Sequence, residues 1–155
     1  MTAERVTAAA LIIGNEILSG RTEDANLAYL GRRLTELGVE LREACVVPDA
    51  HATLVAQVDR LRRANDYLFT TGGIGPTHDD ITAACVAEAV GRPLVENPEA
   101  RALLATRYGE TGLTSARLRM ARIPDGAALI ENPVSGAPGF HIGNVWVMAG
   151  VPAVF

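Results

Sequence analysis

Thr70-Thr71-Gly72-Gly73-Ile74-Gly75-Pro76-Thr77-His78-Asp79-Asp80-Ile81-Thr82 is the stretch of the sequence that says most about the fold. An apolar run at 67–69 leads into it, and a helix-like run at 81–90 follows. Glycines let the backbone turn sharply and approach a ligand closely, and a helix N-terminus offers free N–H donors to an anion. Two adjacent carboxylates would repel a phosphate unless a divalent cation bridged them. The stretch therefore predicts a site for a phosphorylated ligand together with a metal.

Apolar and amphipathic segments alternate on both sides of this stretch. The apolar runs predict strands at 6–13, 39–47, 67–71, 127–130 and 145–148. Helical spacing of apolar residues predicts helices at 24–37, 51–64, 81–90, 97–108 and 115–121. Asn97 is the expected N-cap of its helix, with Pro98 at the first helical position. This order predicts an α/β fold with an open, mostly parallel sheet.

Length and charge limit the possible functions. The 155 residues predict a single domain spanning 1–155. The net charge of -4 argues against a nucleic-acid or membrane-surface binder, although a nucleotide ligand remains possible. No apolar run reaches the roughly 18 residues of a membrane helix, and no signal peptide is visible. Cys45 and Cys85 show no metal-ligand spacing, so we expect a reduced, cytoplasmic protein.

Three polar loops follow the first three predicted strands, at 14–20, 48–51 and 72–80. Ligands on parallel sheets bind at the carboxyl ends of the strands. Neighbouring strands are about 5 Å apart, so these loops could converge on one ligand. A fourth, turn-rich loop at 132–140 could close the pocket.

Each of these features also has a plainer structural interpretation. The three glycines at 72–75 could form a tight turn alone, and no Walker A sequence follows them. Asp79 and Asp80 could cap the following helix and complement its dipole. Asp49 could be the N-cap of the helix at 51–64.

The stretch 70–82 resembles the signature of the molybdopterin-binding (MoaB/Mog-like) superfamily. Its Gly-Pro-Thr-x-Asp-Asp form is similar to that of the competence/damage-inducible protein A branch, CinA. Further segments resemble that branch in the same order, and together they cover nearly the whole chain. They are Ile13-Gly14-Asn15-Glu16-Ile17-Leu18-Ser19-Gly20 with Asp24-Ala25-Asn26, Val46-Val47-Pro48-Asp49, the loop 132–140, and Ala149-Gly150-Val151-Pro152.

The resemblance implies a three-layer α/β/α domain of the molybdopterin-binding type, and homo-oligomers: dimers in the CinA branch, trimers in the molybdenum-cofactor branch. In the cofactor-synthesis enzymes, the aspartates matching Asp49 and Asp80 serve magnesium-dependent adenylylation of molybdopterin. In the CinA branch, the similar domain is linked to metal-dependent hydrolysis of ADP-ribose and related pyrophosphates. Both activities act at a phosphoanhydride, so one site could support either.

The resemblance and the loops together define the expected site. Asp49 and Asp80 are the expected catalytic residues, and Asp49, Asp79 and Asp80 the expected ligands of a divalent metal (Mg, Mn or Co). The residues expected to contact the phosphorylated ligand (ADP-ribose, another nucleotide or molybdopterin) are Gly14, Asn15, Glu16, Asn26, Thr71, Gly72, Gly73, Gly75, Pro76, Thr77, Ser135 and Gly136.

The chain also departs from the CinA pattern. Asn15 stands where threonine is usual, and Ser135-Gly136 where Gly-Thr is usual. Val154 and Phe155 end the chain where the branch continues with glutamate and methionine, which is consistent with a product truncated at its C-terminal end. The first functional hypothesis is a metal-dependent nucleotide pyrophosphatase. The alternatives are a binding module without turnover, a molybdopterin adenylylating enzyme, and a regulatory domain that has lost activity.

Overall fold

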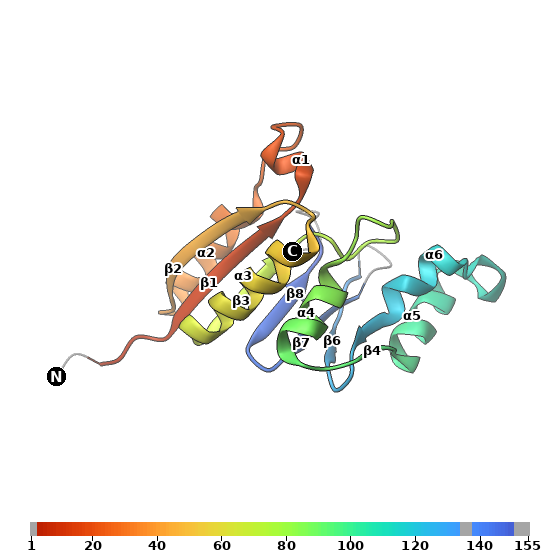
Figure 1. The fold of residues 1–155 in the computed structure, drawn as a ribbon. Helices are drawn as coiled ribbons and strands as arrows, with labels where there is room; N and C mark the ends of the chain where they lie inside the picture. Colours follow the sequence, from red (N-terminus) through yellow and green to blue (C-terminus); the bar gives the residue numbers. More distant parts are fainter. Residues whose placement is uncertain (1–2, 134–137, 151–155) are drawn as a thin grey trace.

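Six strands form the central sheet in the computed structural model, which describes residues 3–133 and 138–150. The strands are β1 (Thr7–Ile13), β2 (Glu40–Val47), β3 (Tyr67–Thr71), β6 (Ala128–Ile130), β7 (Gly139–Ile142) and β8 (Val145–Met148). Their order is β2-β1-β3-β8-β7-β6, and β2, β1, β3 and β8 run parallel (Figure 1). Strand β7 is antiparallel to both of its neighbours. The predicted α/β fold with a mostly parallel sheet is confirmed.

The helices lie between the strands in the chain. They are α1 (Asn15–Leu18), α2 (Asn26–Glu36), α3 (His51–Ala64), α4 (Thr82–Val90), α5 (Pro98–Tyr108) and α6 (Ser115–Leu118), with 3-10 turns η1 (Glu110–Gly112) and η2 (Arg119–Ala121). Two further strands, β4 (Leu94–Glu96) and β5 (Arg122–Pro124), pair antiparallel as a separate small sheet. None of the helices in the described ranges is long and apolar enough to cross a membrane.

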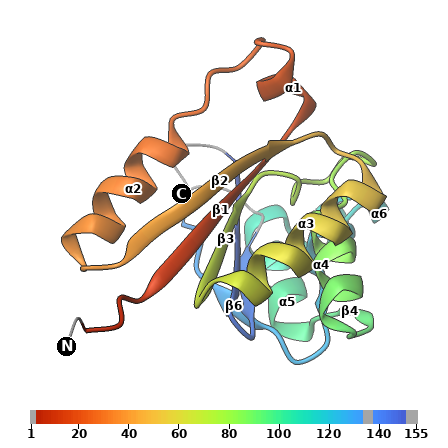
Figure 2. The same cartoon turned by 60° about the vertical axis from the view of Figure 1, so that its left-hand side comes forward.

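Helices cover both faces of the sheet and make the three layers (Figure 2). All seven residues of β1 are buried, and successive side chains point to opposite faces. Ala8 and Ala10 pack with Leu30 and Leu34 of α2 on one face. The alternate residues of β1 pack with α3 and α4 on the other face, in the main core. The continuous apolar run of β1 is thus explained by its central position.

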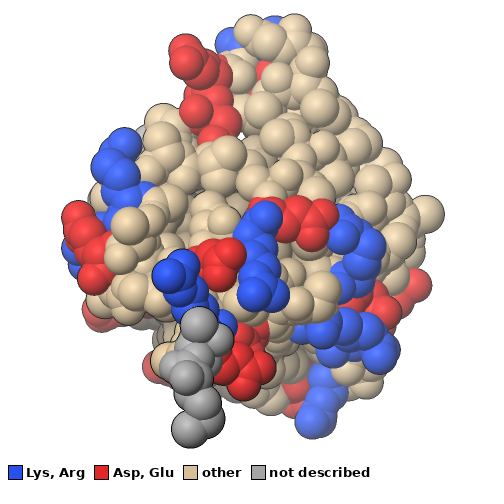
Figure 3. Space-filling model, turned by 90° about the vertical axis from the view of Figure 1, so that its left-hand side faces the viewer, with Lys and Arg blue, Asp and Glu red and all other residues tan. Residues whose placement is uncertain are grey.

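The face that α2 covers is only partly closed. Strand β1 pairs in register with β3, which places Tyr67 and Phe69 on the same face as Ala8 and Ala10. The two aromatic rings stack 6.2 Å apart, and Tyr67 stays 39% exposed. On the surface turned toward the viewer in Figure 3, acidic and basic side chains are interspersed, without a large area of one sign.

The main differences from the sequence prediction are at boundaries and in short elements. Helix α2 begins at Asn26 instead of 24, because the Asp24 carboxylate accepts hydrogen bonds from the N–H groups of Asn26 and Leu27. The prediction that Asn97 caps α5 is confirmed by its hydrogen bond from the Ala100 N–H, 2.9 Å. Elements α1, β4 and β5 have three or four residues each and were not predicted.

Candidate functional site

The loop after β3 has a backbone that only glycine can adopt without strain. Gly72 has φ +98° and Gly73 has φ +72°, values that other residues rarely take. A β-carbon on Gly72 would lie 2.2 Å from the carbonyl oxygen of Ile13, and one on Gly73 would lie 2.1 Å from Oγ1 of Thr82. Both positions therefore require glycine for two independent reasons, conformation and space.

Three hydrogen bonds hold this loop against its neighbours. The Gly72 N–H donates to the carbonyl oxygen of Met148 (3.1 Å) at the end of β8. At the start of α4, the Thr82 hydroxyl donates to the carbonyl oxygen of Gly72 (3.0 Å), and the Thr82 N–H donates to that of Gly73 (3.0 Å). Thr82 is fully buried. The loop is therefore fixed to both the sheet and α4.

The next donors in the loop have no partner among the residues that the structure describes. The N–H groups of Gly73, Ile74 and Gly75 make no hydrogen bond to another described residue. Successive N–H groups in a turn of this kind form a concavity that binds anions. These three N–H groups are therefore candidate donors to an anion, and phosphate binding by this loop stays a prediction.

Asp80 is oriented by its own loop. Its Oδ2 atom accepts hydrogen bonds from the N–H and from the hydroxyl of Thr77, each 2.8 Å. Its Oδ1 atom receives no hydrogen bond from a described residue. Helix α4 begins at Thr82 without a side-chain cap, so the alternative interpretation of Asp80 as a helix cap is wrong. The carboxylate is held in place with one oxygen available to a ligand.

Asp49 joins the first loop to the second. Its Oδ2 atom accepts a hydrogen bond from the Asn15 N–H (3.0 Å), and the Asn15 side-chain oxygen accepts one from the Asp49 N–H (3.3 Å). Helix α3 has Ala50 at its N-cap and no side-chain cap, so the N-cap interpretation of Asp49 is also wrong. The loop after β1 and the loop after β2 are therefore linked by a reciprocal pair of hydrogen bonds.

The structure places the other expected residues in different surroundings. Asp79 is exposed and lies 3.4 Å from Nε2 of His78. Asn26 is buried, and its side-chain amide donates a hydrogen bond to the carbonyl oxygen of Gly150 (3.1 Å), so this amide already has a partner within the fold. Thr71 is buried at the end of β3, and Pro76 is exposed. The Glu16 carboxylate folds back against Gly14. Ser135 and Gly136 lie outside the described residues.

The acidic side chains in the described ranges do not cluster into a set of several metal ligands. No group of three or more His, Cys, Asp or Glu side chains within 3–133 and 138–150 is arranged to hold a metal ion. Asp49 follows β2 and Asp80 follows β3, and β1 lies between these strands, which puts roughly 10 Å between the two strand axes. Magnesium is commonly held by one or two carboxylates plus substrate phosphates and water. Asp80 with its free Oδ1 fits that kind of site.

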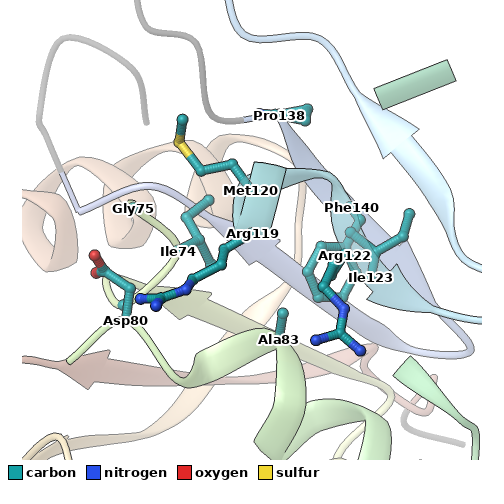
Figure 4. Close-up of a pocket in the computed structure, with 11 residues that line it drawn as sticks. Ile74, Gly75, Asp80, Ala83, Arg119, Met120, Arg122, Ile123, Pro138 and Phe140 are labelled. Atoms are coloured by element: carbon teal, nitrogen blue, oxygen red, sulfur yellow. The ribbon is translucent and has the colours of Figure 1, made fainter. Parts of the chain in front are cut away.

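A small cavity of about 20 Å³ opens beside Asp80 (Figure 4). The glycine loop and α4 form one wall, and η2, β5 and β7 form the other. The residues that line it are Gly73, Ile74, Gly75, Asp80, Ala83, Arg119, Met120, Arg122, Ile123, Pro138 and Phe140. Sequence reasoning missed Arg119 and Arg122, because only the tertiary fold brings 119–122 to the glycine loop.

Comparison with known proteins gives the class to which this fold and site belong. The family model described as "Probable molybdopterin binding domain" matches residues 9–155. The solved structure of a protein named CinA, of unknown function, from Thermoplasma acidophilum is 36% identical with a TM-score of 0.91, over 97% of this chain and 91% of that chain. The tungsten cofactor synthesizing protein MoaB from Pyrococcus furiosus shares the fold at 16% identity, with a TM-score of 0.60 over 99% and 87% of the two chains.

Curated relatives agree with the structural comparison. A protein of Aeropyrum pernix is 45% identical over 129 residues, which is 82% of this chain and 48% of the relative. A CinA-like protein of Sulfurihydrogenibium is 39% identical over 132 residues, 84% of this chain and 33% of that protein. The chain thus spans half or less of the length of these two relatives. It belongs to the molybdopterin-binding (MoaB/Mog-like) family and, within it, to the CinA branch.

Proposed function

We propose that this CinA-type domain hydrolyses a nucleotide pyrophosphate, such as ADP-ribose, with a divalent metal. The observation that carries the proposal is the placement of Asp80. Its carboxylate is fixed by Thr77 and lies beside the N–H groups of 73–75; within 3–133 and 138–150, neither its Oδ1 atom nor these N–H groups have a hydrogen-bond partner. A carboxylate and a set of anion-binding donors on one loop suit a metal-bound phosphate.

In this proposal the loop N–H groups bind phosphate, and the carboxylates bind the metal. The N–H groups of Gly73, Ile74 and Gly75 hold the oxygens of one phosphoryl group and orient it. Asp80 is the expected metal ligand, and Asp49, held by Asn15, faces the same edge of the sheet from the second loop. Bound Mg²⁺, Mn²⁺ or Co²⁺ would neutralise phosphate charge and lower the pKa of a water.

A second candidate function is binding of molybdopterin or a nucleotide, without turnover or with adenylylation. The match of residues 9–155 to a molybdopterin-binding family model favours it. The same loop and the same carboxylates would serve that ligand, because it too carries a phosphate.

The test is AMP release from ADP-ribose, with and without Mg²⁺, Mn²⁺ or Co²⁺, by the wild type and by Asp80→Ala. We expect metal-dependent release that Asp80→Ala abolishes, with the melting temperature largely unchanged because Asp80 is partly exposed. Asp79→Ala separates the two neighbouring carboxylates: Asp79 was also an expected metal ligand, but it is exposed and lies beside His78, so we expect a much smaller effect than that of Asp80→Ala.

Two other outcomes would change the conclusion. Turnover that survives in Asp80→Ala would show that the metal assignment is wrong. Absence of turnover with every metal, together with thermal stabilisation by a nucleotide or a pterin, would favour the binding module.

A further inference from the structure

The wall of the cavity that faces the glycine loop carries positive charge. Arg119 comes from η2 and Arg122 from β5, and both line the cavity that contains Gly75 and Asp80. Figure 4 shows the guanidinium group of Arg119 directed toward Asp80 across the cavity, whereas that of Arg122 ends farther away, past Ala83. Of the two arginines on this wall, Arg119 is therefore the one directed toward the side of the cavity that carries Asp80.

The Arg119 guanidinium has no ion pair to a described carboxylate within 4.0 Å and no hydrogen bond to a described residue, whereas its backbone carbonyl oxygen accepts a hydrogen bond from the Arg122 N–H. This contrasts with Arg33, Arg60 and Arg63, each of which is paired with an acidic side chain. The guanidinium of Arg119 can therefore bind a ligand without first breaking a contact. Five N–H donors in a planar fork match the oxygens of a phosphate.

The backbone that carries Arg119 is firmly placed. Met120 and Ala121, the next residues of η2, are buried with Ala100 and Leu104 of α5 in a second apolar cluster. The Ala121 carbonyl oxygen also accepts a hydrogen bond from the Asn97 N–H, 2.8 Å. The arginine thus projects from a fixed wall, which limits how far it can approach the glycine loop.

Charge in the cavity favours a ligand with two phosphoryl groups. Asp80 contributes one negative charge, and Arg119 and Arg122 contribute two positive charges. A single phosphate held by the N–H groups of 73–75, with a cation on Asp80, would leave the Arg119 guanidinium unused on the opposite wall. The cavity interior, about 20 Å³, holds little more than one water, so a second phosphoryl group attached to the first would lie over its open side, toward Arg119.

We propose that Arg119 is a specificity-determining residue that binds the second phosphoryl group of a diphosphate ligand, while the first lies against the N–H groups of 73–75. The inference rests on the proposed function only in using the same site for a phosphorylated ligand. Binding of the second phosphoryl group by Arg119 would make the site selective for nucleoside diphosphate compounds over nucleoside monophosphates. It concerns binding, so it can be tested without turnover.

The experiment is titration calorimetry of ADP and AMP, with and without Mg²⁺, against the wild type, Arg119→Gln and Arg119→Lys. The wild type should bind ADP more tightly than AMP. Arg119→Gln should lose about tenfold or more in ADP affinity, because hydrogen bonds to a charged group are lost, with AMP affinity changed by less than about twofold. Arg119→Lys should recover only part of the loss, since an ammonium cannot bind in the bidentate way.

Arg92→Gln is the matched control. Arg92 is exposed after α4 and does not line the cavity, so its removal makes the same change in net charge at another place. It should leave both affinities near those of the wild type. Melting temperatures of the ligand-free variants check that each is folded.

The inference is overturned if Arg119→Gln weakens ADP and AMP equally, if it weakens neither, or if the wild type binds neither. These outcomes are separable from failure of the proposed function. A wild type that prefers ADP through Arg119 but releases no AMP from ADP-ribose would refute the hydrolysis alone. A wild type that hydrolyses ADP-ribose while Arg119→Gln keeps the ADP preference would refute the role of Arg119 alone.

Discussion

Substitution of Gly73 by alanine tests whether the glycine loop is specified by space as well as by conformation. The left-handed backbone at Gly73 (φ +72°) costs an alanine about 1–2 kcal/mol. The added β-carbon would also lie 2.1 Å from the buried Oγ1 of Thr82, and overpacking of that kind costs a further 1–3 kcal/mol or so. We therefore expect Gly73→Ala to lower the free energy of unfolding by about 2–5 kcal/mol.

Gly91→Ala is a closely matched control for this change. Gly91 ends α4 with φ +71°, and a β-carbon there would meet no atom within 4 Å. Its substitution should cost only the backbone part, about 1–2 kcal/mol. Both free energies can be measured by urea unfolding with linear extrapolation. Equal costs for the two variants, within about 0.5 kcal/mol, would refute the steric argument.

A third variant locates the overlap. In a Thr82→Ala background the hydroxyl is absent, and the nearest remaining atoms to the new β-carbon are Cβ of residue 82 at 3.3 Å and Cγ2 of Ile13 at 3.6 Å. Gly73→Ala should then cost about as much as Gly91→Ala. If it costs as much as in the wild type, the strain comes from atoms other than the Thr82 hydroxyl.

Three further predictions concern other parts of the molecule. Burial, with a smaller effect of Glu88, raises the pKa of the Cys85 thiol to about 11, so it should resist a thiol reagent near pH 8 until the protein unfolds; rapid labelling of the folded protein would contradict this. The N–H and hydroxyl of Thr7 lower the pKa of Asp66, so Asp66 stabilises the fold above about pH 4, and this stability is lost as the pH falls through the lowered pKa. Asp66→Asn should therefore flatten the acid side of a plot of melting temperature against pH, and an unchanged acid side would count against the assignment. We expect a homo-oligomer, dimer or trimer, formed through the open sheet face around Tyr67, so light scattering should give a smaller mass for Tyr67→Arg; a monomeric wild type would refute it.

Much of the fold could be predicted because its main elements carry strong local signals. The predicted bounds 51–64, 67–71 and 145–148 are those of α3, β3 and β8. Apolar residues at helical spacing define α3, and continuous apolar runs define the central strands. By contrast, β4 and β5 have three residues each and exist through their pairing with one another, across two helices and two 3-10 turns. The local sequence around each of these strands contains no information about a pairing partner so far away in the chain.

The site was predictable in part for a similar reason. The loop glycines and Asp80 lie within one continuous stretch, so their proximity follows from the sequence. The reciprocal hydrogen bonds of Asn15 and Asp49 depend on side-chain geometry. The sequence predicted Asn15 as a ligand contact and Asp49 as a catalytic and metal-binding residue, and predicted no contact between the two. Arg119 reaches the site from a distant 3-10 turn that follows α6. Nothing in the neighbouring residues distinguishes it from an ordinary surface arginine.

The contacts that make the loop stable are also those that make it ready to bind. Gly72 is tied to β8 and α4, and Gly73 to α4, so the free N–H groups that follow are fixed before any anion arrives. Donors fixed in this way need little reorganisation on binding. Changes at Gly73 or Thr82 should therefore lower stability and ligand affinity together. The side chains of Asp80 and Arg119 make no described hydrogen bond to the sheet or to α4, so changes there should lower ligand affinity alone. Measuring stability and affinity together therefore distinguishes residues that hold the loop in shape from residues that contact the ligand.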